Sequence, residues 1–390
     1  MSNLKIKLGT LELDNPLMIA SSPITAKLDL LKEAEDNGFG SVSIKHVMAH
    51  QNFAARPRWY CADRNVIVSG DPRLDPEYGL DLVRRAKEET ELKIICNMSG
   101  KPGSIESWGE LAAELQQAGA DAVELNFNCP NLLSADANTN LLQGANLSSD
   151  PEACGRVVVQ VRGAVDIPII VKLNTESGKA MLVAKSTAAA GADIINIHAS
   201  YRCAPALDIY NGGKLMYPGS ENGNFGAMSG PWARMASNRF IADAARAGTG
   251  KPIMGGSGIS TWQDVVEAVM YGAECVQLCS SVMQQGFGIG KTILAGLHSF
   301  MDAQGYDSIH DMCGTALKYI CNPGQMKYTD AVAHIDETRC VGCRRCTNVA
   351  HCTAISYDAE RKKCRVNGSE CIGCGMCRGQ CARGAIYFDR

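Results

Sequence analysis

The segment KIICNMSGKPGSIESWGELAAELQQAGADAVELNFN (93–128) contains the repeating unit from which the fold can be predicted. Two short apolar runs, KIICNMS (93–99) and AVELNFN (122–128), enclose SWGELAAELQQAGA (107–120), in which apolar residues recur at helical spacing before a glycine. Apolar runs of this length are typical of buried strands, and the spacing between them is typical of an amphipathic helix. The segment therefore predicts a strand–helix–strand unit.

The same alternation extends over residues 1–305. Eight apolar runs end in small or polar residues: PLMIASS (16–22), SVSIKH (41–46), KIICNMS (93–99), AVELNFN (122–128), IPIIVKLN (167–174), DIINIHAS (193–200), PIMGGSG (252–258) and CVQLCSS (275–281). Eight repeats over this length are typical of an α/β protein with a (β/α)8 TIM barrel. A doubly wound α/β sheet would also alternate, but no G-x-G-x-x-G follows the first run, and we favour the barrel.

Two cysteine runs lie near the C-terminus. Each run has three cysteines spaced two residues apart and then a fourth cysteine, a spacing typical of two-cluster ferredoxins, in which the fourth cysteine binds the other cluster. We therefore predict a ferredoxin-like domain with two [4Fe–4S] clusters. The predicted ligands are Cys340, Cys343, Cys346 and Cys381 for the first cluster, and Cys371, Cys374, Cys377 and Cys352 for the second.

Structural zinc is the alternative for paired C-x2-C motifs. Zinc sites normally use two pairs of cysteines, whereas this chain has two triplets, each followed by another cysteine, so we favour iron–sulfur clusters. The gap between Cys346 and Cys352 is longer than in bacterial ferredoxins. Cys364 lies outside the pattern and is interpreted as a bystander.

Length and composition agree with a two-domain enzyme. The chain has 390 residues, of which 46% are hydrophobic, and 39 glycines, as expected for an α/β protein with many tight turns. We divide it into a barrel (1–305), a helical linker (306–330) and a two-cluster domain (331–390). The net charge of −3 gives no reason to expect nucleic-acid binding, and no signal peptide or membrane span is evident. We expect a cytoplasmic protein that has no membrane partner.

In a (β/α)8 barrel the chemistry lies at the C-terminal ends of the strands. These ends carry Ala20, Ser21, Lys45, Asn97, Asn126, Lys172, His198, the 255–258 segment and Ser280. Two lysines at one barrel mouth need partners, because a buried ammonium group is costly when it is unpaired. A planar, electron-rich cofactor that carries a phosphate would supply them.

Two Gly- and Ser-rich turns, MGGSGIS (254–260) and CSSVMQQG (279–286), follow the last two predicted strands. Phosphate sites in these barrels are commonly built from the loops after strands seven and eight. Ser229 and Gly230 could complete the same pocket. A phosphate site beside an iron–sulfur module predicts FMN, which exchanges single electrons with clusters and a hydride with a substrate.

The most specific motif of the barrel is ELNFNCPN (124–131), followed by a polar segment (132–152) that we interpret as a lid. With Lys45, Lys172 and the glycine-rich turns, its N-x-x-C-P-N core resembles the dihydroorotate dehydrogenase family of flavin barrels. The added cysteine runs resemble the dihydropyrimidine dehydrogenase branch, and the resemblance covers nearly the whole chain. It implies that Cys129 is the general acid/base, acting on the substrate carbon next to the one that exchanges hydride with flavin N5.

The resemblance implies further roles. Asn126 and Asn131 would bind amide or carbonyl groups of the substrate. The flavin would be held by Ala20, Ser21, Lys45, Asn97, Asn126 and Lys172, and its phosphate by Gly230, Ser257, Gly258, Cys279 and Ser280. A small packed cysteine behind a proline turn is the alternative interpretation of Cys129.

Two stretches depart from the pyrimidine-handling members, which carry an asparagine after strand two and an Asn-Ser or Asn-Thr pair after strand six. This chain has VSGDPR (68–73) and NIHAS (196–200) there. Strand alternation places His198 and Ser200 on one side, so we predict both as substrate contacts, with a packed strand residue as the alternative for His198. Arg73 is interpreted as the partner of a substrate carboxylate.

We expect an enzyme that reduces or oxidises a C=C bond conjugated to a carbonyl, in uracil or thymine. One alternative is the same chemistry on a non-pyrimidine cyclic amide, enone or activated aromatic, and another is an electron-transfer subunit of a larger complex. Dihydroorotate is disfavoured because members with that activity usually lack a fused cluster domain, and a tRNA-modifying barrel is disfavoured because no basic extension is present.

The electron source is expected to be another protein. No nicotinamide-binding fingerprint occurs in the sequence. The resemblance implies a partner subunit with FAD and NADH, or a reduced ferredoxin, and it also implies an oligomer.

Overall fold

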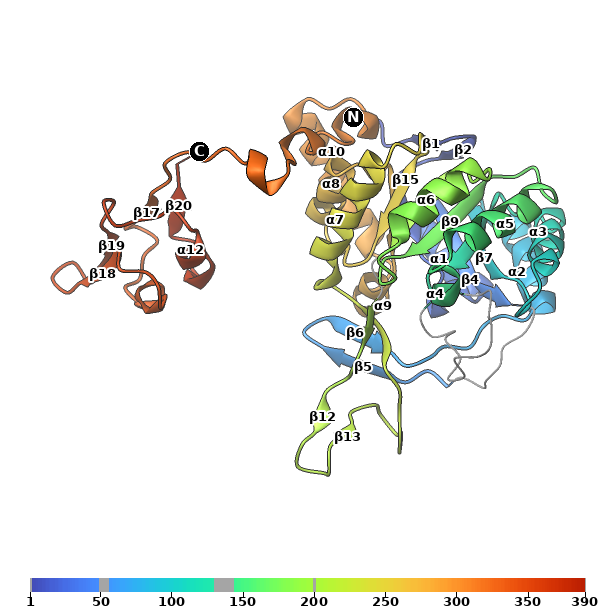
Figure 1. The fold of residues 1–390 in the computed structure, drawn as a ribbon, viewed down its shortest axis with the longest axis horizontal. Coiled ribbons are helices and arrows are strands. Elements are labelled where there is room, and N and C mark those ends of the chain that lie inside the picture. Colours follow the sequence, from blue (N-terminus) through green and yellow to red (C-terminus); the bar gives the residue numbers. More distant parts are fainter. Residues whose placement is uncertain (1, 49–55, 130–143, 199–200, 390) are drawn as a thin grey trace. The chain divides into compact units, whose positions relative to one another are not determined.

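The computed structural model describes residues 2–48, 56–129, 144–198 and 201–389. The chain forms two compact units, Met1–Ile320 and Cys321–Arg390 (Figure 1). Each unit has a hydrophobic core of its own. No helix in the described ranges is both long enough and apolar enough to cross a bilayer.

The first unit contains a closed barrel of eight parallel strands, which confirms the predicted (β/α)8 architecture. Nearly every residue of these strands is buried, because the barrel interior covers one face and the helices cover the other. Each strand coincides with one of the apolar runs. The strands are β3 (Leu17–Ile19), β4 (Ser41–Met48), β7 (Lys93–Ser99), β8 (Ala122–Phe127), β9 (Ile169–Asn174), β10 (Ile194–His198), β15 (Ile253–Gly256) and β16 (Cys275–Leu278).

Amphipathic helices surround the barrel (Figure 1). Local sequence signals determine where several of them begin: the side chains of Asp75 and Asp150 each accept a backbone N–H in front of a proline, and Thr261 and Asp264 form a capping box. The helices are α1 (Leu28–Asp36), α2 (Pro76–Glu89), α3 (Glu106–Gln117), α5 (Pro151–Arg162), α6 (Ala180–Ala189), α7 (Ala233–Arg246), α8 (Trp262–Met270) and α10 (Ile289–Gln304), with a short α9 (Ser280–Gln285) after β16.

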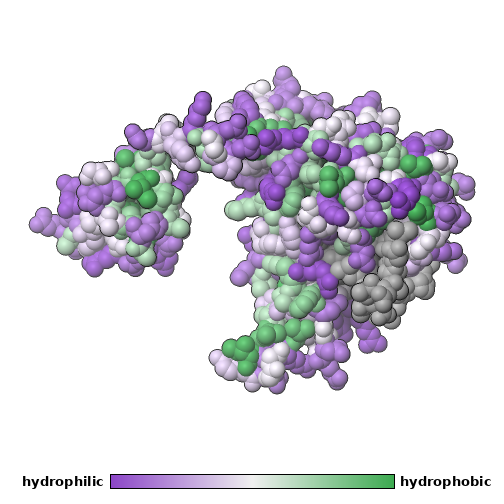
Figure 2. All heavy atoms as spheres, in the orientation of Figure 1, coloured by the Kyte–Doolittle hydropathy of each residue, from purple (hydrophilic) through white to green (hydrophobic). Residues whose placement is uncertain are grey.

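Strands outside the barrel add three smaller sheets to the first unit. An antiparallel sheet has the order β11 (Tyr201–Cys203), β14 (Gly226–Ser229), β6 (Asn65–Val68), β5 (Trp59–Ala62), and the two hairpins are β1–β2 (Ile6–Leu8, Leu11–Leu13) and β12–β13 (Leu207–Asp208, Lys214–Leu215). The β12–β13 hairpin forms the end of an arm (Figure 1), where Leu207, Ile209, Tyr210 and Met216 are exposed. Figure 2 shows hydrophobic colouring at this end of the arm.

The segment interpreted as a lid is only partly described, since residues 132–143 fall outside the described ranges. Its C-terminal end is ordered secondary structure: α4 (Gly144–Leu147) is followed by α5, which begins at Pro151. The Ser148 hydroxyl also donates to the carbonyl of Phe127 at the end of β8. The expectation of a loop through residue 152 was therefore wrong at this end, because Asp150 and Pro151 form a helix start.

The second unit is small and rich in cysteine. Its elements are β17 (Ala333–Ile335), η5 (Arg345–Asn348), β18 (Ile355–Asp358), β19 (Lys363–Val366), α12 (Met376–Gln380) and β20 (Ile386–Phe388), and β17 pairs with β20 and β18 with β19. The chain before β17 forms short helical turns, α11 (Ile309–Met312), η3 (Leu317–Tyr319) and η4 (Pro323–Gln325). Four of the nine buried core residues of this unit are cysteines.

Candidate active site

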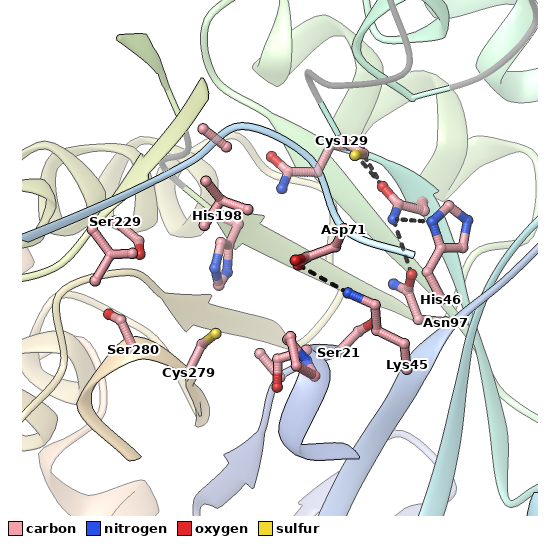
Figure 3. Close-up of a pocket in the computed structure, with 18 of the residues that line it drawn as sticks. Ser21, Lys45, His46, Asp71, Asn97, Cys129, His198, Ser229, Cys279 and Ser280 are labelled. Carbon is pink, nitrogen blue, oxygen red and sulfur yellow. Dashed lines mark hydrogen bonds and ion pairs between the residues drawn. The ribbon is translucent and has the colours of Figure 1, made fainter. Parts of the chain in front are cut away.

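A cavity opens at the C-terminal ends of the barrel strands, as predicted (Figure 3). The empty space in and above it measures about 950 Å³, a figure that includes open solvent at the mouth. Residues from many strand ends line it: Ala20, Ser21, Lys45, Asn97, Asn126, Cys129, Lys172, His198, Ser229, Ser257, Cys279 and Ser280. Gly230 and Gly258 line a second cavity, which shares Ser280. Asn131 and Ser200 lie outside the described residues.

The floor of the cavity is organised around Glu124, which is fully buried in β8. Its carboxylate accepts hydrogen bonds from Ser43, Asn97, Asn196 and Gln277 at 2.6–2.8 Å. The Lys172 ammonium lies 3.8 Å from the same carboxylate. Burial raises the pKa of Glu124, but the Lys172 charge and the hydrogen-bond donors oppose it, and the pKa stays below its usual value. Glu124 is therefore a fixed negative charge beneath the site.

Both lysines predicted at the mouth have protein partners. Lys45 donates to Asp71 at 3.1 Å, and Lys172 donates to the side-chain oxygen of Gln277 at 2.7 Å. Burial is the main cause that lowers the pKa of Lys45, Arg73 adds to it, and Asp71 opposes it. We expected both lysines to need a ligand as their partner. This expectation was wrong, because Asp71 and Gln277 accept their hydrogen bonds.

The amide of Asn126 holds the turn that presents Cys129. Its oxygen accepts the backbone N–H of Asn128 at 3.1 Å and that of Cys129 at 2.9 Å. Its nitrogen donates to the Asn97 side-chain oxygen at 2.9 Å and lies 3.3 Å from His46 Nδ1. Asn126 lines the cavity as predicted, and these contacts give it the further role of positioning the cysteine.

Cys129 lies beside a guanidinium group. Arg73 Nη2 donates to Cys129 Sγ at 3.0 Å, and Arg73 Nη1 donates to the carbonyl of Asp71 at 3.2 Å. Both Arg73 and Cys129 line the cavity. The structure thus brings together the predicted acid/base thiol and the arginine that was predicted to bind a carboxylate.

The Gly- and Ser-rich turns lie at the other end of the cavity from Cys129 (Figure 3). Ser257 has a left-handed backbone with φ +73°, which is uncommon for a residue other than glycine and is often found at functional sites. The hydroxyl oxygens of Ser257 and Ser281 are buried and have no hydrogen-bond partner in the described part of the chain. Buried hydroxyl groups without partners suit a ligand that carries many acceptor oxygens, such as a phosphate.

Two histidines in the cavity wall are held neutral. Burial, and to a lesser degree Arg73, keeps the pKa of His46 well below its usual value, and burial together with Lys172 does the same for His198. His46 also pairs with Ser99 at 2.8 Å. His198 Nδ1 is buried against Gly256 of the neighbouring strand and has no hydrogen-bond partner among the described residues.

Several residues of the site were not predicted, namely Glu124, Asp71, His46 and Gln277. Glu124 lies in the quoted motif, two residues before Asn126, so strand alternation already places both side chains on the same face of the strand. Asp71 lies in the quoted VSGDPR segment. Neither residue could be paired from sequence, because their partners lie on other strands.

The predicted cluster ligands line two cavities of the second unit. Cys340, Cys343, Cys346 and Cys381 line one, and Cys352, Cys371, Cys374 and Cys377 line the other. Each cavity thus contains the fourth cysteine of the opposite run. Cys364, interpreted as a bystander, is buried and lines the first cavity. Within the described residues, however, no three His, Cys, Asp or Glu side chains are grouped closely enough to hold a metal ion.

Comparison with known proteins agrees with the barrel. The profile described as "Dihydroorotate dehydrogenase" matches residues 3–301. The chain belongs to the dihydroorotate dehydrogenase family. Enzymes of this family bind FMN, and the chain is a flavin-dependent oxidoreductase of that family.

Relatives carry two different names. The chain is 29% identical over 325 residues to the dihydroorotate dehydrogenase B (NAD(+)) catalytic subunit of Pyrococcus furiosus, covering 81% of this chain and 99% of that protein. It is 27% identical over 359 residues to the NAD-dependent dihydropyrimidine dehydrogenase subunit PreA of Escherichia coli K12, covering 88% of this chain and 84% of that protein. Because 88% of 390 residues is about 343, the second alignment must extend beyond residue 320 into the second unit.

Proposed function

We propose that this protein reduces, or in reverse forms, a C=C bond conjugated to a carbonyl in a pyrimidine such as uracil or thymine. The observation that carries the proposal is the barrel mouth, where Cys129 lies at one end of a single cavity and the Gly- and Ser-rich turns lie at the other. The alignment with the dihydropyrimidine dehydrogenase subunit supports it, because that alignment extends past the barrel.

The residues of the mouth fit FMN. The unpartnered hydroxyl groups of Ser257 and Ser281 would receive the phosphate, together with Gly230, Gly258, Cys279 and Ser280. Ala20 and Ser21 would pack on the ring, and Lys45, Asn97 and Lys172 lie where they could bond its polar edge. When bound, FMN supplies a hydride at its ring nitrogen and accepts electrons one at a time.

Cys129 would move the proton. Asn126 fixes the backbone of Cys129 through two N–H groups, and the Arg73 guanidinium fixes the position of the sulfur. A thiol held in this way can protonate the substrate carbon adjacent to the one that receives the hydride, or remove that proton in the reverse direction. His198 and the undescribed Asn131 and Ser200 are proposed to contact the substrate.

We also propose that the second unit binds two [4Fe–4S] clusters and receives electrons from a partner protein. The support is that each cavity is lined by the four cysteines that ferredoxin connectivity would combine, although they come from separate runs. The proposed organisation is a barrel (1–305), a linker (306–330) and a cluster domain (331–390). The partner would be a subunit carrying FAD and NADH, or a ferredoxin, and we propose an oligomer.

An anaerobic experiment tests the proposed reaction. The purified holoenzyme is reduced until the flavin absorbance is bleached, and uracil or thymine is then added. Prompt reoxidation of the flavin together with formation of the dihydropyrimidine is the expected result. A flavin that stays reduced with both bases would remove the pyrimidine assignment.

Dihydroorotate oxidation is a second candidate, favoured by a specific observation. Dihydroorotate carries a carboxylate, and Arg73 presents a guanidinium beside Cys129, where it could bind that group. The name of the Pyrococcus relative agrees with this candidate.

The charge at position 73 distinguishes the two candidates. If the substrate is a carboxylate, Arg73→Gln should lower kcat/KM for dihydroorotate by about 10²-fold, because a charge-assisted pair to the substrate is lost. Turnover of uracil by the same variant should fall less, because only the contact that positions the Cys129 sulfur is lost. Equal effects on both substrates would show that Arg73 acts through Cys129 and not through a substrate carboxylate.

A further inference from the structure

The overall charge of −3 conceals a strong asymmetry between the two units. The second unit, residues 321–390, contains 11 Lys and Arg against 7 Asp and Glu, a net charge of +4. The first unit contains 27 Lys and Arg against 34 Asp and Glu, a net charge of −7. Seven of the 11 cations lie between residues 339 and 365, around the first cysteine run.

The two cysteine loops allow an internal comparison. We call Cys340–Cys346 (CVGCRRC) the first cysteine loop and Cys371–Cys377 (CIGCGMC) the second cysteine loop. Their backbones correspond: Gly342 and Gly373 both have φ +67°. They differ in charge, because Arg344 and Arg345 of the first loop replace a glycine and a methionine of the second.

Arg344 occupies a position that suits glycine. Its φ is +62°, in the left-handed region, and Gly375 at the equivalent position of the second loop has φ +79°. Its guanidinium lies 3.8 Å from the centre of the Tyr357 ring. The free energy that a cation–π contact gains at an exposed position is about equal to the free energy that a non-glycine residue loses in the left-handed region. Local stability therefore gives little reason for an arginine here, whereas a function for the charge does.

Further cations surround the first cysteine loop. A Cβ on Gly342 would collide with the carbonyl of Lys362, so the loop packs directly against the turn that carries Lys362. Lys363 donates to the carbonyl of Cys340, and Arg345 and Arg383 line the first cavity. The cavity of the second loop is lined by Glu370 and, among the described residues, by no lysine or arginine.

The charge of a bound cluster does not explain why the first loop has more cations than the second. An oxidised cluster with four thiolates carries about two negative charges, and this holds for both loops. Compensation of the cluster charge would therefore call for equal numbers of cations at the two loops. The excess at the first loop needs another explanation.

Each loop has an exposed apolar residue after its first cysteine, Val341 in the first loop and Ile372 in the second. Val341 is 59% exposed, and Cys343 is exposed. The side chains of Arg339, Arg344, Arg345, Arg361, Lys362 and Arg383 are exposed as well. An exposed apolar residue surrounded by charges is the usual composition of a surface that binds a charged protein partner and steers its approach.

We propose that the first cysteine loop and its surrounding cations dock an acidic one-electron carrier protein, such as a small acidic ferredoxin. This inference rests on the proposed iron–sulfur clusters, and it specifies which of the two would receive electrons. Each encounter moves one electron from the reduced carrier to the protein. Two encounters, with two protons from solvent, supply what the reduction of one C=C bond requires.

The test converts the first loop into the second. In R344G/R345M each arginine is replaced by the residue at the equivalent position of the second loop. The glycine at position 344 also removes the strain of a left-handed non-glycine residue. The matched control K327M/R378M removes two exposed cations of the same unit outside the first loop. Stopped-flow spectroscopy measures the second-order rate constant for reduction of the holoenzyme by a reduced acidic [2Fe–2S] ferredoxin, and calorimetry measures binding of the oxidised ferredoxin.

At low ionic strength R344G/R345M should react about tenfold more slowly than wild type, and the control should stay within about twofold. The wild-type rate should fall steeply with salt, and the rate of the variant should fall less. Equal rates for R344G/R345M and K327M/R378M, a rate independent of salt, or equally tight binding of a duplex DNA would overturn the proposal.

A second assay separates failure of the proposed function from failure of the docking surface. With dithionite as the reductant no carrier protein is involved, so turnover of uracil by wild type and by both variants tests the proposed function apart from docking. If dithionite-driven turnover is absent in all three while ferredoxin binding still depends on Arg344 and Arg345, the pyrimidine assignment fails and the docking surface stands.

Discussion

The barrel mouth and the cysteine-rich unit differ in how their polar groups are satisfied. In the mouth, the charged groups have protein partners before any ligand is added. Lys45 pairs with Asp71, Lys172 pairs with Glu124, and neighbouring amides donate to Glu124. In the second unit the cysteines line cavities, and among its described residues they are not grouped closely enough to hold a single metal ion. The comparison indicates that the barrel holds its site by its own packing, whereas the second unit would depend on the clusters that we propose for it.

The largest expected effect is the response of the two units to iron. The second unit has 70 residues and a core in which four of nine buried residues are cysteines, too few apolar contacts for independent stability. Without iron–sulfur reconstitution, backbone amides of residues 321–389 should exchange hydrogen rapidly, because binding energy and folding energy are the same quantity in such units.

Hydrogen exchange followed by mass spectrometry measures this directly, and the barrel helices serve as the internal control. Their protection should be the same with and without iron. A second unit that remains protected in iron-free protein would show that its own core is sufficient, and the contrast between the units would disappear.

The next effect concerns the network beneath the mouth. Glu124→Ala leaves three buried amide groups without their acceptor and the buried Lys172 charge without its counter-ion, which should lower the free energy of unfolding of the barrel by about 3–5 kcal/mol. Chemical denaturation followed by near-UV circular dichroism measures the change. Glu114→Ala, on the exposed face of α3, is the control and should stay within about 0.5 kcal/mol. A similar small loss for Glu124→Ala would mean that the network is not preorganised.

The smallest effect is a pH dependence of barrel stability. The pKa of buried His46 lies well below its usual value, so the unfolded chain binds this proton at higher pH than the folded one. Stability is therefore fully present above about pH 6.5 and is lost as pH falls toward the folded pKa, by about 1.4 kcal/mol per pH unit from this residue.

Denaturation midpoints measured between pH 7 and pH 5 test this. The midpoint should depend less steeply on pH in His46→Gln than in wild type. An unchanged slope in His46→Gln would mean that His46 is protonated in the folded protein.

The sequence predicted the barrel well because the information is local. Each strand is a short apolar run and each helix has its own periodicity, so the ends of the strands, with Lys45, Asn97, Asn126 and Lys172, could be located along the chain. The cysteine connectivity stays a prediction, made from the ferredoxin spacing, which is itself a rule about which residues combine.

The partners of these residues could not be predicted because they depend on register across the barrel. Asn97 pairs with Glu124 across β7 and β8, and Lys172 lies beside both Asn126 and Asn196 in the neighbouring strands. Gln277 reaches Glu124 from β16, which is 153 residues away along the chain. The closeness of Arg73 to Cys129 likewise depends on how two loops fold over one cavity.

The central claim is that Cys129 supplies the proton at a mouth that is otherwise complete. The most direct measurement compares anaerobic reoxidation by uracil of fully reduced wild-type protein and Cys129→Ala, with Cys61→Ala, an exposed cysteine, as the control. We predict that Cys129→Ala retains its flavin and its stability but reoxidises about 10²–10⁴-fold more slowly, while Cys61→Ala behaves as wild type. Reoxidation of Cys129→Ala at the wild-type rate would contradict the account and favour a barrel that only transfers electrons.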